Sequence, residues 1–173
     1  MKEIVRPAVV LLIITAVAAM LLGIVSETTK AAIAEQSAKT EAEAMAAVMP
    51  EDGVEFETLY DTANGDTIEG TIKKVAKATK GGETIGFVLT TAPSGFGGEV
   101  STMVGVDLEG TVTGLRVLSH AETPGLGALS TSPDFYEQFV GKQGPIQVTK
   151  DGGEIVPITS ATITSRAVSD GAN

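Results

Sequence analysis

An apolar stretch near the N-terminus is the strongest hydrophobic pattern in the chain. Residues 7–26 carry no charged side chain and lie between Arg6 and Glu27. A helix of this length spans roughly 30 Å, which matches the hydrocarbon core of a bilayer. A cleaved signal peptide is the alternative, but the apolar part of such a peptide usually covers only about 7–15 residues. The pattern therefore favours an uncleaved transmembrane anchor over residues 1–28.

The charges that flank this anchor predict its orientation. Lys2, Arg6 and the terminal amine precede the apolar stretch, and Glu3 offsets them only in part. Because positive charge is retained on the cytoplasmic side, we expect the N-terminus in the cytoplasm. The prediction is a single-pass protein of the cell (inner) membrane whose remaining residues lie on the extracytoplasmic side.

The segment after the anchor has the composition of a helix. Residues 29–49 are rich in Ala and Glu, and Pro50 ends the pattern. Its few large apolar side chains are Ile33, Met45, Val48 and Met49. We predict a solvated helical stalk over residues 29–50, and packing of this helix against partner membrane subunits is the alternative.

The hydrophobic pattern of the chain changes after the stalk. Short runs rich in Thr, Val and Ile, separated by turns that contain Gly or Asp, are typical of strands. The predicted strands are residues 71–76, 84–91, 101–107, 111–119 and 146–149, with a hairpin turn at residues 108–110. Strands with helices interspersed predict a single α+β domain over residues 51–173.

Two helices are predicted within this domain. The first covers residues 133–140, with Ser132 as N-cap and Pro133 at the first helical position. Its apolar face is expected to hold Phe135, Phe139 and Val140. The second helix is predicted from Ser165 to the end of the chain.

The composition narrows the possible chemistry. The chain has no Cys, a single His (His120) and a formal net charge of −10. These counts exclude disulfides, thiolate nucleophiles, Cys-ligated clusters and a multi-His metal site within one chain. The negative charge repels phosphate backbones, so we expect no nucleic-acid binding, and no metal site is predicted.

Three Gly- or hydroxyl-rich stretches remain as candidates for a site. Residues 95–98 lie between two predicted strands and lack the Lys-Ser/Thr of a phosphate loop. They form either an ordinary turn or a place where backbone amides approach a flat ligand, with Phe96 as an apolar contact. In the second stretch, residues 119–128, Pro124 and Gly125 fit the central pair of a type II turn. His120 beside Glu122 is more typical of a local hydrogen bond than of a catalytic pair.

The third stretch, residues 159–166, is dense in hydroxyl groups and precedes the predicted C-terminal helix. One interpretation is an anion site, because the backbone amides at a helix start point outward beside these hydroxyls. The alternative is a cluster that simply caps the helix. The hydroxyl and guanidinium groups belong to Thr159, Ser160, Thr162, Thr164, Ser165 and Arg166.

The last two stretches together resemble a known family, the FMN-binding domain of the G subunit of Rnf-type electron-transport complexes. The C subunit of sodium-translocating NADH:quinone reductase is a close relative of that family. The resemblance rests on His-Ala-Glu-Thr-Pro-Gly-Leu-Gly at residues 120–127, on Thr-Ser-Ala-Thr at residues 159–162 and on Gly-Phe-Gly-Gly at residues 95–98. Two positions depart from the family pattern: Ser160 stands where the family has Gly, and Val156 where it often has Asp.

The resemblance implies a covalent cofactor. FMN would be attached to Thr162 through a phosphoester, in a reaction carried out by a separate Mg²⁺-dependent flavin transferase outside the cytoplasm. It implies phosphate contacts from Thr159, Ser160, Thr164 and Ser165, and ring contacts from Glu122, Thr123, Leu126 and Phe96. Ala161 and Gly125 complete the expected cofactor-binding residues. Glu122 near the ring would lower the reduction potential of the flavin.

The resemblance also implies partners, because nothing in the chain is expected to bind NAD or ferredoxin. The protein would be an electron-transfer subunit of a ferredoxin:NAD⁺ oxidoreductase that couples electron flow to Na⁺ or H⁺ translocation. An iron–sulfur-bearing membrane subunit and a second flavin subunit would be its electron partners. The alternatives are a C-type quinone-reductase subunit, a stand-alone extracytoplasmic flavoprotein and an unflavinylated membrane-anchored scaffold domain.

Overall fold

The computed structural model describes residues 2–67 and 70–173 and divides into two compact units, Met1–Thr40 and Glu41–Asn173. Met1, the first residue of the predicted anchor, lies outside the described residues. So do the side chains of Lys2 and Glu3, on which the predicted orientation partly rests. The predicted boundaries at residues 28 and 50 stay predictions.

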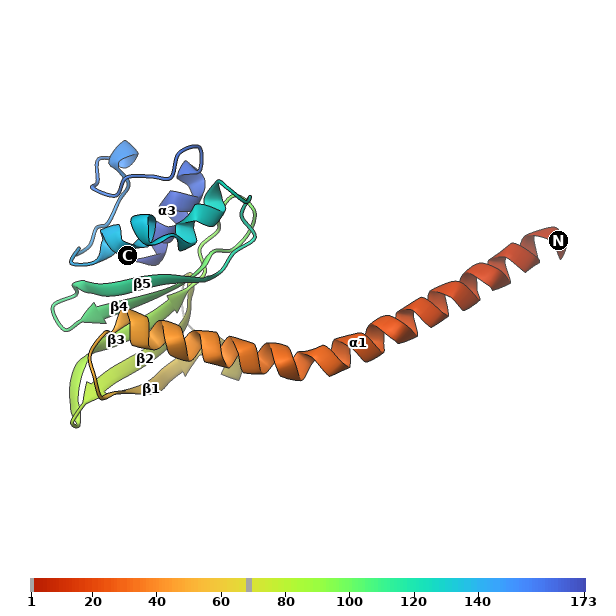
Figure 1. Cartoon of the computed structure of the whole chain (residues 1–173), viewed down its shortest axis with the longest axis horizontal. Helices are drawn as coiled ribbons and strands as arrows, with labels where there is room; N and C mark the ends of the chain where they lie inside the picture. Colours follow the sequence, from red (N-terminus) through yellow and green to blue (C-terminus); the bar gives the residue numbers. More distant parts are fainter. Residues whose placement is uncertain (1, 68–69) are drawn as a thin grey trace. The chain divides into compact units, whose positions relative to one another are not determined.

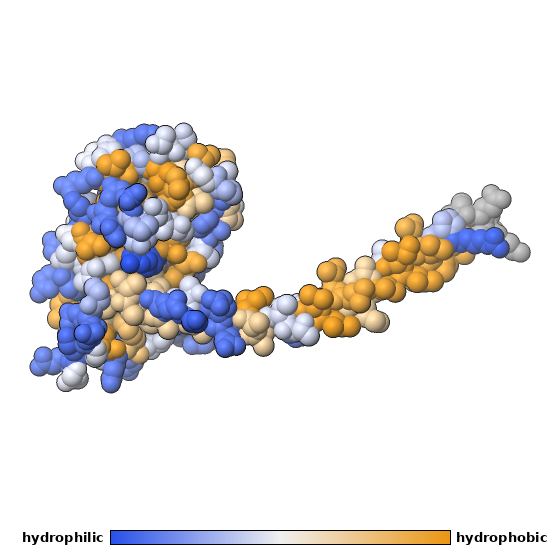
Figure 2. All heavy atoms as spheres, in the orientation of Figure 1, coloured by the Kyte–Doolittle hydropathy of each residue, from blue (hydrophilic) through white to orange (hydrophobic). Residues whose placement is uncertain are grey.

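The first unit belongs to a single helix, α1 (Lys2–Val48), which runs through both the predicted anchor and the predicted stalk. It is the one described helix that is long and apolar enough to cross a membrane, and its best window has a mean hydropathy of 3.0. Its apolar side chains are exposed around the helix, as the visible face in Figure 2 shows. Length, composition and exposure together favour a lipid environment for residues 7–26 of α1.

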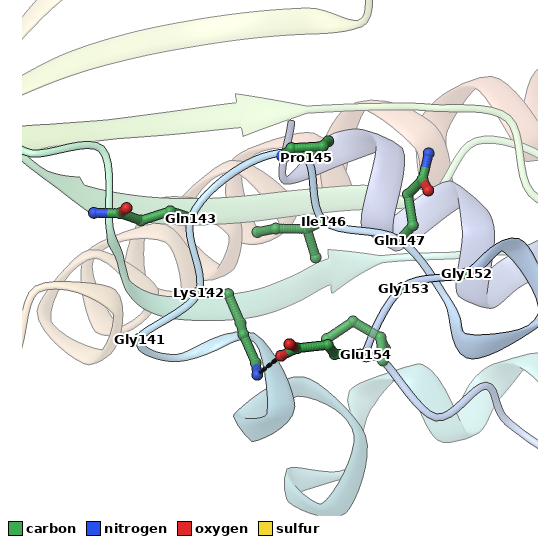
Figure 3. A pocket seen from close by; sticks show the side chains of 10 residues that line it. Gly141, Lys142, Gln143, Pro145, Ile146, Gln147, Gly152, Gly153 and Glu154 are labelled. Atoms are coloured by element: carbon green, nitrogen blue, oxygen red, sulfur yellow. Dashed lines mark hydrogen bonds and ion pairs between the residues drawn. The ribbon is translucent and has the colours of Figure 1, made fainter.

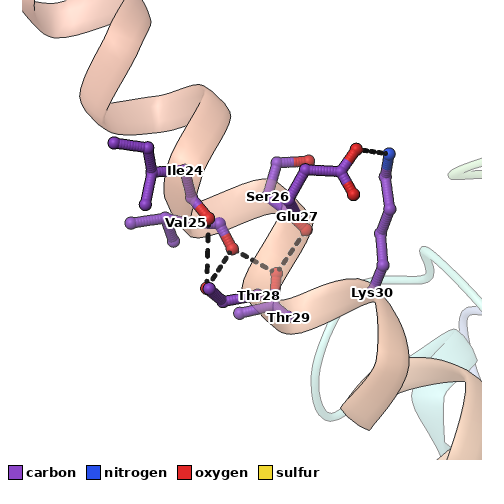
Figure 4. Close-up of polar contacts among 7 residues, drawn as sticks. All are labelled: Ile24, Val25, Ser26, Glu27, Thr28, Thr29 and Lys30. Atoms are coloured by element: carbon purple, nitrogen blue, oxygen red, sulfur yellow. Dashed lines mark hydrogen bonds and ion pairs between the residues drawn. The ribbon is translucent and has the colours of Figure 1, made fainter.

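Hydroxyl groups in this helix are satisfied by the helix itself. The Thr15 hydroxyl donates to the carbonyl oxygens of Leu11 and Leu12 at 2.9 and 3.0 Å. Thr28 and Thr29 make the same kind of bond one turn back, close to the Glu27–Lys30 ion pair of 2.7 Å (Figure 4). These threonine hydroxyls therefore present no free donor that would oppose membrane insertion.

The second unit contains a five-stranded antiparallel sheet in the order β1-β2-β3-β4-β5, so each strand pairs with its neighbour in sequence (Figure 1). The strands are β1 (Val54–Asp61), β2 (Ile72–Lys80), β3 (Glu83–Thr91), β4 (Ser101–Asp107) and β5 (Val112–Ser119). The turn between β4 and β5 is closed by the Asp107 carboxylate, which accepts from the amides of Glu109 and Thr111. The predicted hairpin and the α+β class are thus confirmed.

Both faces of the sheet are covered, because side chains alternate along each strand. On β4, Met103 packs with Val88 against the end of α1, whereas its neighbour Val104 packs on the opposite face against Leu115 and the C-terminal elements. Figure 1 shows α3 on this second face. The sheet is therefore the middle layer of the domain.

The last turns of α1 are part of this core. Ala44, Val48 and Met49 are buried, and the Thr113 hydroxyl on β5 donates to the Val48 carbonyl oxygen at 2.6 Å. A Cβ added at Gly114 would stand 2.6 Å from Val48 Cα, so glycine makes room for the helix end. The solvated stalk predicted up to residue 50 is thus wrong at its C-terminal end, where Met45, Val48 and Met49 join the core and only Ile33 of the predicted large apolar side chains stays exposed.

The chain after β5 consists of short helices and turns. They are η2 (Gly127–Thr131), α2 (Pro133–Tyr136), η3 (Glu137–Phe139), η4 (Thr149–Asp151) and α3 (Thr162–Gly171). The predicted helix 133–140 is therefore one α-helical turn followed by a 3₁₀ turn. Phe135 and Phe139 pack edge to face with ring centroids 5.5 Å apart, but Val140 is exposed and does not share their face.

The strand predicted at residues 146–149 is wrong. Val148 forms only an isolated parallel bridge with Ile155, and Thr149 already begins the 3₁₀ turn η4. The chain reverses at Gly152, which adopts a φ of +89° and brings Ile155 back beside residue 148. The segment is too short for a ladder because the reversal follows so closely.

Candidate functional site

A small open pocket of about 210 Å³ lies where three segments of the domain meet. These segments are the loop before β4, the loop after β5 and the start of α3. The lining residues are Phe96, Glu122, Thr123, Leu126, Gly127, Ser160, Ala161, Ile163 and Thr164. Seven of the residues predicted from the sequence are thereby brought together, although they are separated by up to 68 positions in the chain (164 − 96).

The loop after β5 has the predicted turn. The amide of Leu126 donates to the Thr123 carbonyl oxygen at 3.1 Å, and Gly125 between them has a φ of +75°. This is the geometry of a type II turn with Pro124 and Gly125 in its centre. The turn places Thr123 and the partly exposed Leu126 at the edge of the pocket, while Gly125 itself is not among the lining residues.

Glu122 forms the buried floor of the pocket, with 6% of its surface exposed. Its Oε1 accepts from the Gly97 amide at 3.0 Å, and its Oε2 accepts from the Thr164 hydroxyl at 2.6 Å. One carboxylate therefore joins all three segments. This tethering role is not predicted from the sequence, and the expected contact of Glu122 with a flavin ring stays a prediction.

The carboxylate of Glu122 is ionised at neutral pH. Burial acts to raise its pKa, but hydrogen bonds from the Thr164 hydroxyl and from the backbone amides of Gly97 and Phe96 outweigh it, with a smaller contribution from His120. The pKa of Glu122 consequently lies below its ordinary value of 4.5.

His120 supports this carboxylate through the backbone. Its Nδ1 accepts a hydrogen bond from the Glu122 amide at 3.2 Å, so this nitrogen carries no proton. The contact is the local hydrogen bond that the sequence favours. It does not form a catalytic pair with the Glu122 side chain.

Glycines around Glu122 permit the close packing of its neighbours. A Cβ at Gly95 would collide with Glu122 Oε1, and one at Gly127 would collide with Glu122 Oε2 and stand 2.6 Å from Thr164 Oγ1. The missing side chains of this region thus let the backbone approach the protein's own carboxylate. Phe96, in the same loop as Gly95, is 72% exposed and offers its ring to the pocket.

Helix α3 begins at Thr162, three residues before its predicted start, with the buried Ala161 in the N-cap position. Thr162 is half-buried, and its Oγ1 accepts a hydrogen bond of 2.8 Å from Lys150 Nζ. The first amides of a helix have no intrahelical acceptor, so donors and a positive dipole end surround this hydroxyl.

The hydroxyls that follow Thr162 are committed to the protein. Thr164 and Ser165 are fully buried: Thr164 donates to Glu122, and Ser165 accepts from the Ile158 amide and donates to the Ala161 carbonyl oxygen, both at 2.9 Å. They hold residues 158–161 and the Glu122 loop against α3. Their predicted contacts with a phosphate stay predictions.

Ser160 has a φ of +62°, the left-handed conformation that favours glycine. The departure from the family's Gly therefore falls at a strained backbone position. Thr159, its exposed neighbour, lines a separate depression of about 310 Å³ together with Val156 and is not among the residues that line the pocket beside Glu122.

Sequence reasoning missed Gly127, Ile163 and Lys150. Ile163 follows Thr162 on the first turn of α3 and adds an exposed apolar side chain to the pocket. Lys150 lies in η4, twelve positions before Thr162, and only the fold brings the two side chains together. For Lys150, the one signal in the sequence was that a cationic side chain directly precedes the turn residues 151–153.

A larger hollow of about 470 Å³ lies elsewhere in the domain, between residues 141–147 and 152–155 (Figure 3). Its two charged side chains, Lys142 and Glu154, point toward each other and form an ion pair. Because this pair neutralises itself and none of the predicted site residues lines the hollow, size alone does not identify the functional site.

The part of the chain that matches a known family includes the smaller pocket. A family model described as "FMN-binding domain" matches residues 95–173, a range that begins at the Gly95 loop and includes every lining residue of the pocket. The crystal structure of Shewanella oneidensis NqrC has the same fold, with a TM-score of 0.52 at 18% identity over 70% of this chain and 77% of that one. The fold and the pocket define a membrane protein with an FMN-binding domain.

Two relatives are similar over nearly the whole chain. The G subunit of the ion-translocating oxidoreductase complex of Methanosarcina acetivorans is 34% identical over 98% of this chain and 90% of its own length. The G subunit of the Na(+)-translocating ferredoxin:NAD(+) oxidoreductase complex of Acetobacterium woodii is 32% identical over 99% and 89%. The chain belongs to the family of G subunits of ion-translocating oxidoreductase complexes.

Proposed function

We propose that this protein carries FMN, bound covalently through a phosphoester to Thr162, and passes electrons between other subunits of an Rnf-type membrane complex. The observation that supports this most directly is the position of Thr162. Its half-buried hydroxyl stands at the start of α3, against the Lys150 ammonium, and directly precedes the pocket residue Ile163. A phosphate on this oxygen would meet a cation and free amides, and a ring would meet apolar side chains.

The residues of the chain bind and orient the cofactor, while the bound flavin supplies the redox chemistry. Phe96, Leu126 and Ile163 would offer apolar surface to the ring at this open pocket. The ionised Glu122 lies in the floor and disfavours additional negative charge on the ring.

Partners supply the rest of the reaction. Among the described residues, no group of three or more His, Asp or Glu side chains could hold a metal ion, and the sequence has no Cys for a cluster. We infer that other subunits complete the active site. We infer electron exchange with an iron–sulfur-bearing subunit and a second flavin subunit, in a ferredoxin:NAD⁺ oxidoreductase that couples this transfer to Na⁺ or H⁺ movement.

Maturation and location follow from the same proposal. Thr162 has a cation and not a base beside it, so a separate flavin transferase would remove its proton. We place the N-terminus in the cytoplasm and the FMN domain outside it, with residues 7–26 of α1 as a single membrane span, because Lys2 and Arg6 precede the apolar stretch.

The attachment is tested by coexpressing the full chain with a flavin transferase and examining it for flavin fluorescence after SDS electrophoresis and for intact mass. We expect one FMN, less water, on the native chain and on Thr71→Ala, the matched control that removes an exposed hydroxyl just before β2, away from every predicted site residue. Thr162→Ala should carry none. Covalent flavin on Thr162→Ala would disprove this attachment site, and none on the native chain would favour the scaffold alternative.

A further inference from the structure

The ammonium of Lys150 contacts a different kind of group from the ammonium groups of six other lysines of the described chain. Each of the six has a carboxylate within 4.0 Å: Lys30, Lys73, Lys74, Lys77, Lys80 and Lys142. Lys150 forms no such ion pair within the described part of the chain, and its Nζ donates instead to Thr162 Oγ1 at 2.8 Å. In an acidic protein, an ammonium held on a hydroxyl has its charge available for an anion.

Both oxygens of the adjacent carboxylate, Asp151, are bound by Arg166, and the charge of Lys150 makes only a smaller contribution to the lowered pKa of Asp151. Arg166 Nε and one terminal guanidinium nitrogen donate to the two oxygens of Asp151 at 2.6 and 2.7 Å. This bidentate contact is the main reason that the pKa of Asp151 lies below its usual value, so the carboxylate is charged and occupied. The same contact ties η4 to α3, which fixes the backbone of Lys150 relative to Thr162.

We propose that Lys150 positions the Thr162 hydroxyl for flavinylation and then pairs with the phosphate joined to it; this inference rests on the proposed attachment at Thr162. The hydroxyl accepts from the ammonium and keeps its own proton free for a base of the transferase. In the transfer, a bond forms from Thr162 Oγ1 to the phosphorus of a flavin phosphoanhydride. The anhydride P–O bond breaks, and the nucleotide phosphate leaves with the electron pair.

The charge of Lys150 acts on both stages. Before transfer it attracts the anionic flavin donor to the start of α3, and afterwards it faces the oxygens of a phosphodiester that carries one negative charge. A charge-assisted contact of this kind is stronger than a neutral one and is weakened by salt where it is exposed. Lys142 is the matched comparison, because its ammonium is bound to Glu154 and does not contact Thr162.

The test measures the initial rate of covalent flavin incorporation into the detergent-solubilised full chain, with purified flavin transferase, a flavin dinucleotide and Mg²⁺. We expect Lys150→Met to slow incorporation by about three- to tenfold, the range of one charge-assisted contact to phosphate at an accessible site. Lys150→Arg should restore most of the rate, and Lys142→Met should match the native chain. The ³¹P signal of the loaded protein should shift in Lys150→Met and not in Lys142→Met.

The outcomes separate this inference from the proposed function. A native rate and an unchanged ³¹P signal in Lys150→Met, with no covalent flavin on Thr162→Ala, would overturn the role of Lys150 and leave the attachment site standing. Equal slowing in Lys150→Arg and Lys150→Met, with lowered melting temperatures in both, would also overturn it, since the residue would then act only on the fold. Covalent flavin on Thr162→Ala would defeat the proposed attachment itself.

Discussion

The contact of Glu122 with three segments predicts a pocket that depends on a single carboxylate. Glu122→Ala would remove the acceptor for the Thr164 hydroxyl, which is fully buried, and for the Gly97 amide. A buried donor left without a partner costs about 1–3 kcal/mol. Because the Gly97 amide lies in an open loop that water can reach, we count one full penalty and part of a second. The free energy of unfolding should fall by about 2–4 kcal/mol.

Glu122→Gln separates charge from shape. Its amide oxygen can accept from Gly97 and its amide nitrogen can donate to Thr164 Oγ1, so both links between segments survive. The charge is lost, and so is the acceptor for the Thr164 proton. We expect a smaller loss of about 1–2 kcal/mol, the usual difference between a charged and a neutral acceptor. The control is Glu99→Gln, whose side chain is exposed on the surface and pairs with Lys73.

The lowered pKa of Glu122 determines whether its contribution to the free energy of unfolding rises or falls with pH. The folded pKa of Glu122 lies below its ordinary value of 4.5, so the native chain binds fewer protons at this site than the unfolded chain. The stability that the charge contributes is therefore complete above pH 4.5 and is lost as the pH falls through the folded pKa.

Urea unfolding of the native chain and both variants, followed by circular dichroism between pH 3 and pH 8, measures these differences. The gap between native chain and Glu122→Gln should be constant above about pH 5.5 and should narrow on acidification. A gap that stays constant down to pH 3, or a Glu122→Ala variant as stable as Glu99→Gln, would refute the reasoning.

Two further substitutions probe the backbone of the site. Ser160→Gly should relieve a left-handed residue that costs about 1–2 kcal/mol, less about 0.4–1 kcal/mol of added freedom in the unfolded chain, for a net gain of about 0.5–1 kcal/mol; Ser160→Ala should show no such gain in the same urea titration. Gly127→Ala should lower the free energy of unfolding by about 1–3 kcal/mol, because its Cβ would meet Glu122 and Thr164. Gly110→Ala is the comparison: it adds a Cβ at a positive φ, with no atom within 4 Å of it. A stable Gly127→Ala variant would show that the loop can move away from α3.

Local patterns in the sequence determined a large part of this protein. The continuous helix follows from an apolar stretch joined to an Ala- and Glu-rich segment with no proline between Pro7 and Pro50, because helix propensity and bilayer thickness act on neighbouring residues. The strands at residues 84–91 and 101–107 and the turn at Pro124-Gly125 were also predictable, since each depends on residues that are close in the chain. The motifs at residues 120–127 and 159–162 indicated the flavin family for the same reason.

Other features were outside the reach of local patterns. β1 was not predicted because its alternation covers only residues 54–57. Residues 58–60 are all exposed, the register with β2 shifts there, and pairing with β2 decides the conformation of the strand. The strand at residues 146–149 was predicted wrongly because an apolar run cannot reveal whether a partner strand lies beside it.

Only the tertiary structure decided the site itself. From the sequence, Glu122 is a side chain displayed on a turn. In the structure, the loop before β4 and the start of α3 bury it, and its carboxylate holds the segments of the pocket together. Lys150 is an ordinary surface lysine until the Asp151–Arg166 contact fixes η4 against α3 and sets its ammonium on Thr162. The physical reason is the same in both cases: a charge acquires its role from the groups that surround it, and those groups come from distant parts of the chain.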